Sequence, residues 1–171
     1  MADEAISLFD MNADGRLSVD ELLAAPGLLA GFARNDADKD EVLSADEIAA
    51  RLAYYKRMRD GVKGGYSCRV LYNGRPIENA KVRFVPEAFL ADVTEPATGV
   101  SKSGGGVHLT IEGYDVPDDL KSLSMIRIGM YRVEVTHDTI VIPPQYNSAT
   151  ELGVEVSPNS DPSVVFDLVQ D

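Results

Sequence analysis

Side-chain oxygens recur at every second position in an acidic stretch near the start of the chain. Asp10, Asn12 and Asp14 supply the first three, and Glu21 supplies a carboxylate at the twelfth position. Ca²⁺ is a hard cation that takes six to eight oxygen ligands, and a tight loop can bring that many to one centre. The spacing therefore predicts a calcium site in residues 10–21, against the alternative of an ordinary acidic surface turn.

The remaining positions of this stretch fit the same site. Gly15 falls where the loop needs a positive φ, and Leu17, between the ligands, is expected to point into the core. A backbone carbonyl is expected from position 16 and a hydroxyl or a bridging water from position 18. The predicted ligands are Asp10, Asn12, Asp14, Arg16, Ser18 and Glu21.

A second stretch with the same spacing covers residues 36–47. It departs at Glu41, which stands in the place of the glycine and has to accept a left-handed backbone, at a cost of about 1 kcal/mol. Four carboxylate ligands, against three in the first stretch, favour metal binding in spite of this strain. The alternative is a degenerate copy kept only for pairing, and better geometry is expected in the first stretch. The predicted ligands are Asp36, Asp38, Asp40, the carbonyl of Val42, Ser44 and Glu47.

Both stretches resemble the calcium loops of EF-hand proteins. The resemblance implies a compact, all-α EF-hand pair over residues 1–60. Helices are expected at residues 2–9, 27–35 and 45–59, with a brief helix at 22–25 that Pro26 ends. Calcium sensors expose grooves rich in methionine, and the methionines of this segment do not cluster. A structural or buffering pair is therefore favoured over a calmodulin-like switch.

The overall composition restricts the kind of partner. The 171 residues include 28 acidic and 16 basic side chains, which gives a net charge of −12. Nucleic acids and anionic membranes attract basic surfaces, so this charge favours cations as partners and argues against both. The longest apolar run is broken by Pro26 and Gly27 and falls far short of the roughly 20 residues of a membrane helix. Cys68 is the one cysteine, so no intrachain disulfide is expected.

From residue 66 onward the helical spacing stops and apolar residues alternate with polar ones, which predicts half-buried strands. Residues 61–65 are rich in glycine and are expected to form a linker. The expected fold class is α+β with two domains: the EF-hand pair at 1–60 and an antiparallel β-sandwich at 66–171, with a small barrel as the alternative. The residues predicted to face inward are Cys68, Val70, Tyr72, Val82, Phe84, Val107, Leu109, Ile111, Tyr131, Val133, Val135, Leu152, Val154, Val156, Val164, Phe166 and Leu168.

Three strings in this second half carry a resemblance to a known family. They are N-G-R-P at 73–76, A-K-V-R-F at 80–84 and G-M-Y-R-V at 129–133. Residues 66–169 thereby resemble the carboxypeptidase-regulatory-like, or transthyretin-like (prealbumin-like), domains of exported bacterial proteins, in which such a domain can follow an EF-hand pair. The resemblance implies a non-catalytic protein in an extracytoplasmic setting (periplasmic, cell-surface or secreted), with its leader absent from this sequence.

Catalytic motifs are weak in this sequence. His108 and His137 stand far apart, with no H-x-H pattern, and are expected to be solvated surface residues, while Cys68 is expected to be buried and unreactive. The sequence therefore predicts a non-enzymatic protein in which two Ca²⁺ ions act as structural staples. The alternative is a calcium-dependent interaction module of the dockerin kind, whose protein partner is unknown. A third possibility is an enzyme that uses a site on the sandwich, drawn from His108, His137, Tyr131 and Tyr146.

Overall fold

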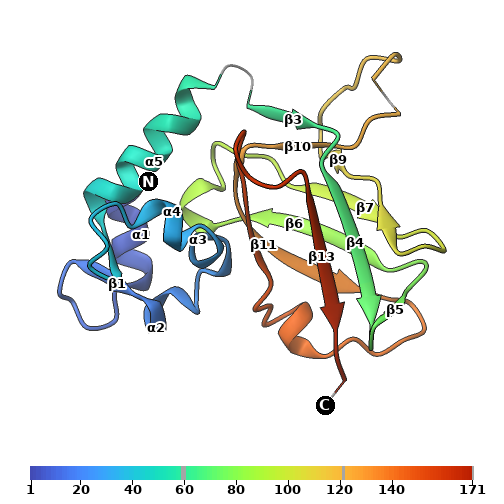
Figure 1. Ribbon diagram of the computed structural model, residues 1–171, viewed down its shortest axis with the longest axis horizontal. Coiled ribbons are helices and arrows are strands. Elements are labelled where there is room, and N and C mark those ends of the chain that lie inside the picture. Colours follow the sequence, from blue (N-terminus) through green and yellow to red (C-terminus); the bar gives the residue numbers. More distant parts are fainter. Residues whose placement is uncertain (59–60, 121, 171) are drawn as a thin grey trace.

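The computed structural model describes residues 1–58, 61–120 and 122–170. Figure 1 shows short helices gathered at one end of the molecule and β-sheets at the other. Strands account for 32% of the residues and helices for 24%. The first residues of the chain belong to the helical cluster, and the last strand lies among the sheets.

The helical cluster contains five short helices and two short strands. Two of the helices begin with capping boxes, in which Ser18 pairs with Glu21 and Ser44 pairs with Glu47. Pro26 opens the third helix, where its missing N–H costs nothing, and Gly31 separates the third from the fourth. The helices are α1 (Ala2–Phe9), α2 (Val19–Leu22), α3 (Pro26–Ala30), α4 (Phe32–Asn35) and α5 (Ala45–Arg57), and two 3₁₀ turns, η1 (Ala88–Leu90) and η2 (Pro144–Tyr146), lie among the strands.

The strands form four sheets in the described part of the chain. They are β1 (Arg16–Ser18), β2 (Val42–Ser44), β3 (Val62–Gly64), β4 (Ser67–Tyr72), β5 (Arg75–Pro76), β6 (Lys81–Pro86), β7 (Ala97–Val100), β8 (Gly106–Val107), β9 (Thr110–Ile111), β10 (Met125–Arg127), β11 (Gly129–Thr136), β12 (Gly153–Val156) and β13 (Ser163–Leu168). A five-stranded antiparallel sheet has the order β12-β11-β6-β7-β9. A four-stranded sheet has the order β13-β4-β5, with β8 also paired to β4. β1 pairs with β2, and β3 pairs with β10.

The main core lies between the two larger sheets. Phe84 of β6 sits at its centre, with ring centroids 6.3 Å from Tyr66, 6.1 Å from Tyr131 of β11 and 6.3 Å from Phe166 of β13. Burial of one such side chain contributes roughly 1.5–3 kcal/mol, so these rings are a large part of the attraction between the sheets. The residues predicted from the alternation to face inward are all buried or half-buried, which confirms that part of the prediction.

The expected fold class is wrong, because the described N-terminal residues, 1–58, do not form an all-α domain. Helices α2, α3 and α4 are only four or five residues long, and β1 and β2 lie among them. Gly31 divides the single helix expected over residues 27–35 into α3 and α4, and α3 begins at Pro26. The brief helix expected over residues 22–25 is instead α2, which ends at Leu22.

The second half also differs from a purely antiparallel sandwich. Strand β13 pairs in parallel with β4, and the long chain segment between them provides the crossover connection that a parallel pair requires. The alternating run at 107–111 is not one strand, since β8 belongs to the four-stranded sheet and β9 to the five-stranded sheet. The residues expected to form a linker, 61–65, include β3, which is hydrogen-bonded to β10.

The helical cluster packs directly on the five-stranded sheet. Its own hydrophobic core takes in Phe89 and Leu90 of η1 and Met130 of β11. Helix α3 lies against β11 and β12, where Gly27 and Gly153 allow close approach of the two backbones. The helix α3, which lies between the two acidic loops in the chain, therefore attaches the helical cluster that carries both loops to the sheet.

Candidate metal centres

Loop 1 (residues 10–21) is folded by its own carboxylate and amide oxygens. Asp10 accepts the backbone N–H of Ala13 at 2.7 Å and that of Gly15 at 2.9 Å. Asn12 Oδ1 accepts the N–H of Asp14 at 2.8 Å. The side chains of Asp10 and Asn12 therefore lie on the inner side of the turn, where ligands of a bound cation belong.

Glu21 closes loop 1 from the first turn of α2. It is 3% exposed, and it accepts the N–H of Met11 at 2.9 Å, the N–H of Ser18 at 2.8 Å and the Ser18 hydroxyl at 2.7 Å. These hydrogen bonds, with the Ser18 N–H first among them, hold the pKa of Glu21 below its usual value. The carboxylate is therefore ionised and fixed in orientation, as a closing metal ligand needs to be.

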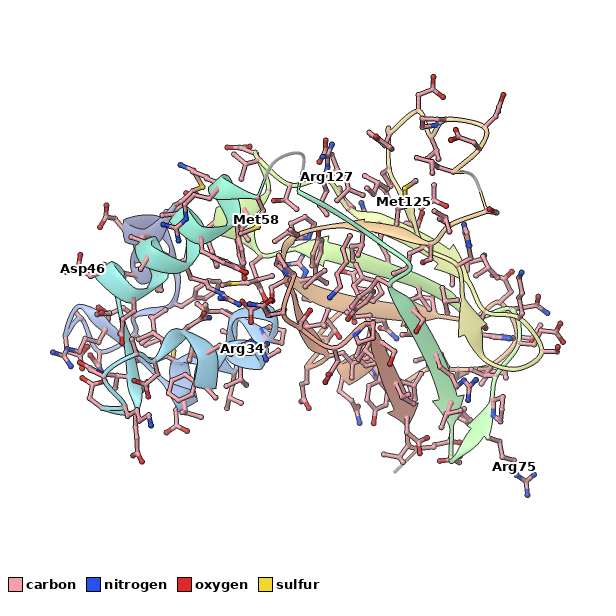
Figure 2. The ribbon with its side chains drawn as sticks, turned by 45° about the horizontal axis from the view of Figure 1, so that its top comes forward. Arg34, Asp46, Met58, Arg75, Met125 and Arg127 are labelled. Atoms are coloured by element: carbon pink, nitrogen blue, oxygen red, sulfur yellow. The ribbon has the colours of Figure 1, made fainter. Side chains whose placement is uncertain are left out.

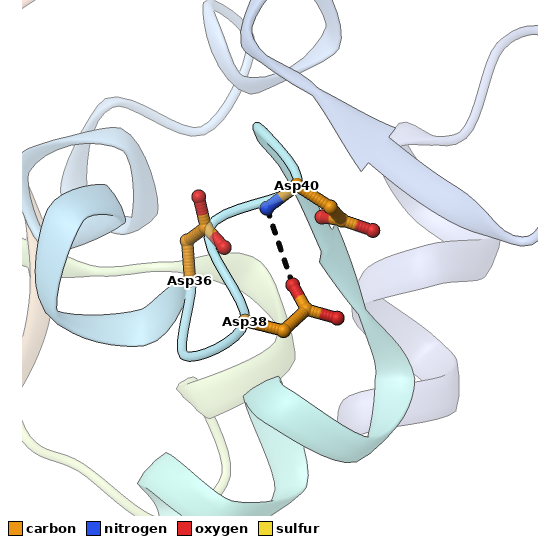
Figure 3. A group of neighbouring side chains, drawn as sticks. All are labelled: Asp36, Asp38 and Asp40. Atoms are coloured by element: carbon orange, nitrogen blue, oxygen red, sulfur yellow. Dashed lines mark hydrogen bonds between the residues drawn. The ribbon is translucent and has the colours of Figure 1, made fainter.

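Loop 2 (residues 36–47) repeats this arrangement and gathers its charges more closely. Asp36 Oδ1 accepts the N–H of Lys39 at 2.7 Å, and Asp38 Oδ1 accepts the N–H of Asp40 at 3.2 Å. Carboxylate oxygens of Asp36, Asp38 and Asp40 all lie within 4.8 Å of one another (Figure 3). Among the described residues, the acidic groups of loop 1 form no equally close cluster.

Two carboxyl groups of loop 2 have pKa values that are shifted in opposite directions. The pKa of Asp38 is raised, first by burial and then by the neighbouring carboxylates of Asp40, Glu47 and Asp36. For Glu47, burial acts upward, but hydrogen bonds from the Ser44 backbone and hydroxyl and from the Ala37 N–H leave its pKa lowered. A cation placed among the three aspartates would relieve their repulsion.

Glu41 adopts the backbone conformation that the glycine position requires. Its φ is 67°, close to the 84° of Gly15 at the equivalent place in loop 1. Ala13 and Lys39 are also equivalent and have φ of 61° and 63°. Loop 2 thus keeps the turn of loop 1 and carries the strain of a left-handed glutamate.

The two loops are joined by a short antiparallel ladder. Strand β1 pairs with β2 so that Leu17 stands opposite Leu43, and both side chains are fully buried. The predicted inward direction of Leu17 is confirmed. The predicted carbonyl donors Arg16 and Val42 also lie in this ladder, and the Arg16 guanidinium forms an ion pair with Asp40 of the other loop.

The donor set suits a hard divalent cation. The predicted ligand atoms in both loops are oxygens of carboxylates, an amide, hydroxyls and backbone carbonyls, with no sulfur or imidazole in either set. The structure groups Asp36, Asp38 and Asp40 together, while Glu47 lies outside this close group and faces the N–H of Ala37 at 2.8 Å. The residues therefore fit Ca²⁺, with Glu21 and Glu47 poised to close their loops from the flanking helices.

One buried cluster escaped sequence reasoning. Glu155 of β12 is 2% exposed, and its carboxylate accepts hydrogen bonds from Arg34 Nε at 2.6 Å, from Arg51 Nε at 2.5 Å and from the Tyr55 hydroxyl. Burial, followed by the charge of Glu155, raises the pKa of Tyr55. The one signal in the sequence was a charged residue inside an apolar run of the strand, at 153–156.

A second buried carboxyl joins the helices to the sheet at another point. Glu87, directly after β6, is 1% exposed and accepts the Gly27 N–H of α3 at 2.6 Å. Burial raises the pKa of Glu87 to about 7. The titration of Glu87 is therefore expected to make the stability of the protein depend on pH near neutrality.

The residues considered for an enzyme have separate structural surroundings. His137 uses Nδ1 to accept the N–H groups of Thr139 and Ile140, and its Nε2 lies 2.9 Å from the Glu78 carbonyl oxygen. The Tyr131 hydroxyl donates to the Arg127 carbonyl oxygen at 2.9 Å. The Tyr146 hydroxyl accepts the N–H of Val169, and His108 is half-buried between β8 and β9. Cys68 is buried, and this burial raises the pKa of its thiol to about 12.

Comparison with known proteins adds no relative to this picture. No family model matches the chain, and no curated protein matches its sequence. Within the described residues, no helix has both the length and the apolar character needed to cross a membrane. The two acidic loops are therefore the feature of the chain that bears most directly on its function.

Proposed function

We propose that this chain is a non-enzymatic calcium-binding protein in which loops 1 and 2 each hold one Ca²⁺. The observation that carries the proposal is the close approach of Asp36, Asp38 and Asp40, whose oxygens lie within 4.8 Å of one another. Three carboxylates at this distance repel each other, and a divalent ion coordinated by them converts that repulsion into attraction. Loop 1 repeats the same spacing of donors and joins loop 2 through the β1–β2 ladder.

The bound ions act as structural staples in this proposal. The loops are mounted on helices that pack on the five-stranded sheet, so ligation would stabilise the whole helical cluster. The proposed setting is extracytoplasmic, where modules with Kd of about 10⁻⁴ to 10⁻³ M are loaded by the calcium present. The resemblance of residues 66–169 to exported modules supports this setting.

Calorimetric titration of the metal-free chain with Ca²⁺ tests the proposal. We expect two binding events, and an increase in thermal stability that a chelator reverses. Glu21→Gln and Glu47→Gln each remove one closing ligand and are expected to abolish one event each. Asp20→Asn and Asp46→Asn, which neutralise exposed neighbours, are the matched controls and should leave both events in place. Titration without heat, together with unchanged melting, would refute the proposal.

A second candidate function is a calcium-dependent interaction module. Large apolar side chains of loop 1 and its flanking helices are exposed: Leu8, Met11, Val19 and Leu23. Exposed apolar groups around a metal loop favour docking of a protein partner once the metal has ordered the loop. A partner that is captured with calcium, released by chelator and lost on Leu23→Ser would support this second function.

A further inference from the structure

The Glu155 carboxylate of β12 contacts the helices on both sides of loop 2. Its side chain is fully buried, and its two oxygens are shared between helices, because Arg34 of α4 donates to Oε2 and Arg51 of α5 donates to Oε1. The Tyr55 hydroxyl of α5 also donates to Oε1. Figure 2 shows Arg34 at the boundary between the helical cluster and the sheets. One carboxylate of the sheet therefore holds α4 and α5 at a common point.

These contacts lie very near the two ends of loop 2. Arg34 stands two residues before Asp36, the first predicted ligand, and Arg51 stands four residues after Glu47, one turn further along α5. A metal in loop 2 needs Asp36 and Glu47 to converge. Fixing α4 relative to α5 therefore fixes the frame in which these two ligands meet.

The same contacts control the charge beside loop 2. Arg51 is held further by the rings of Tyr54 and Tyr55, whose centroids lie 5.0 Å and 5.3 Å from its guanidinium carbon. Without the Glu155 carboxylate, the charges of Arg34 and Arg51 would be uncompensated next to a loop that has to attract a cation. Geometry and charge thus act in the same direction.

Loop 1 is attached to the rest of the molecule in another way. Phe9, at the end of α1, packs edge-on against Phe89 of η1 with ring centroids 6.5 Å apart. This apolar contact carries no charge and does not involve β12. Loop 1 is joined to loop 2 by the β1–β2 ladder, but the hydrogen bonds to Glu155 come from α4 and α5, so a direct effect of Glu155 should be larger in loop 2 than in loop 1.

We propose that Glu155 is a positioning residue for loop 2. By holding Arg34 and Arg51 it preorganises the loop for Ca²⁺, and Ca²⁺ in loop 2 in turn tightens the docking of α4 and α5 on β12. The two effects are one coupling free energy and have to be reciprocal. This inference rests on the proposed function, and it goes further by naming the sheet residue through which metal binding and docking are linked.

The test compares the two loops separately in the full-length chain. In a Glu21→Gln background Ca²⁺ titration reports loop 2, and in a Glu47→Gln background it reports loop 1. Adding Glu155→Gln is expected to raise the Kd of loop 2 about tenfold and to change that of loop 1 less than about twofold. Glu151→Gln, at an exposed site just before β12, is the control and should change neither value.

Hydrogen exchange provides the reciprocal measurement. In the Glu21→Gln background, Ca²⁺ is expected to slow exchange of the β12 amides, and Glu155→Gln should remove that calcium-dependent protection. If Glu155→Gln does not fold, Arg34→Gln replaces it, since that side chain is 44% exposed and contributes only one of the hydrogen bonds. Because Arg34→Gln also removes a positive charge beside loop 2, the readout for this variant is the calcium-dependent protection of the β12 amides, which should decrease.

The outcomes separate this inference from the proposed function. Unchanged loop 2 affinity and unchanged protection in the folded variant would overturn the coupling while leaving calcium binding in place. Equal losses of affinity in both loops would mark a general loss of stability and would also overturn it. If the unmodified chain binds no Ca²⁺ in either loop, the proposed function fails and the coupling fails with it.

Discussion

Gly153 of β12 and Pro26 of α3 approach each other so closely that a side chain cannot fit between them. A Cβ atom on Gly153 would stand 1.8 Å from the Pro26 carbonyl oxygen and 2.0 Å from its carbonyl carbon. Gly27, the next residue of α3, also leaves no room for a side chain, because a Cβ atom added there would stand 2.5 Å from the Tyr131 backbone nitrogen. The helical cluster is thus seated on the sheet through backbone contacts that only glycine permits.

Gly153→Ala is expected to displace α3 from its packing position on β12. The new Cβ atom would collide with backbone atoms, so α3 would have to shift, at a cost of roughly 1–3 kcal/mol in the free energy of unfolding. Chemical denaturation measures this loss. Gly104→Ala is the control, because nothing lies within 4 Å of its Cβ position, and it should change stability by less than about 0.5 kcal/mol. Equal stability of the two variants would show that the Pro26 backbone does not pack directly against Gly153.

Glu41→Gly is expected to stabilise the folded conformation of loop 2. The left-handed φ of 67° is strained for glutamate and relaxed for glycine, so the variant should gain about 0.5–1 kcal/mol in folded stability. Calcium titration in the Glu21→Gln background should show a Kd for loop 2 that is unchanged or lower. Glu41→Ala removes the same charge but keeps a Cβ atom, so a gain from glycine that alanine does not match is due to backbone strain. The same effect from both variants would assign it to the charge.

Local patterns in the sequence were sufficient to find the loops and the inward faces of most strands. The donors of loop 1 lie within twelve residues, and their order alone defines the turn that Asp10 and Asn12 fold around themselves. The alternation of apolar and polar residues along the strands likewise predicts that Phe84 and Val133 lie in the core, where both are fully buried. These features were predictable because each depends on residues that are near neighbours in the chain.

The seating of the helices was not predictable, because it depends on pairs far apart in the sequence. Arg34 and Glu155 are separated by 121 residues, and neither has a local pattern that names its partner. Between the loops, Gly31 divides into α3 and α4 the segment for which the sequence predicts one helix over 27–35, because the effect of a single glycine on a helix depends on its tertiary surroundings. The parallel pairing of β13 with β4 also has no local signal.

Glu87 is expected to make the metal-free protein less stable as the pH rises through neutrality. Its pKa is about 7 in the folded chain, raised by burial, against about 4.5 for an exposed glutamate, so the folded state binds the proton more tightly between these values. The stability that protonation contributes is complete below about pH 4.5 and is lost as the pH rises through 7, by up to about 3 kcal/mol. Urea unfolding at pH 5 and pH 8 measures this change.

Glu87→Gln isolates the contribution of this one carboxyl. The glutamine oxygen can still accept the Gly27 N–H, but the side chain stays neutral at every pH. The variant should therefore be more stable than the unmodified chain at pH 8, and this advantage should shrink or vanish at pH 5. Glu78→Gln, at an exposed position, is the matched control and should follow the unmodified chain at both values. Parallel pH profiles for Glu87→Gln and the unmodified chain would mean that Glu87 remains ionised in the folded protein at pH 5, stabilised by the Gly27 N–H and the nearby charge of Arg132.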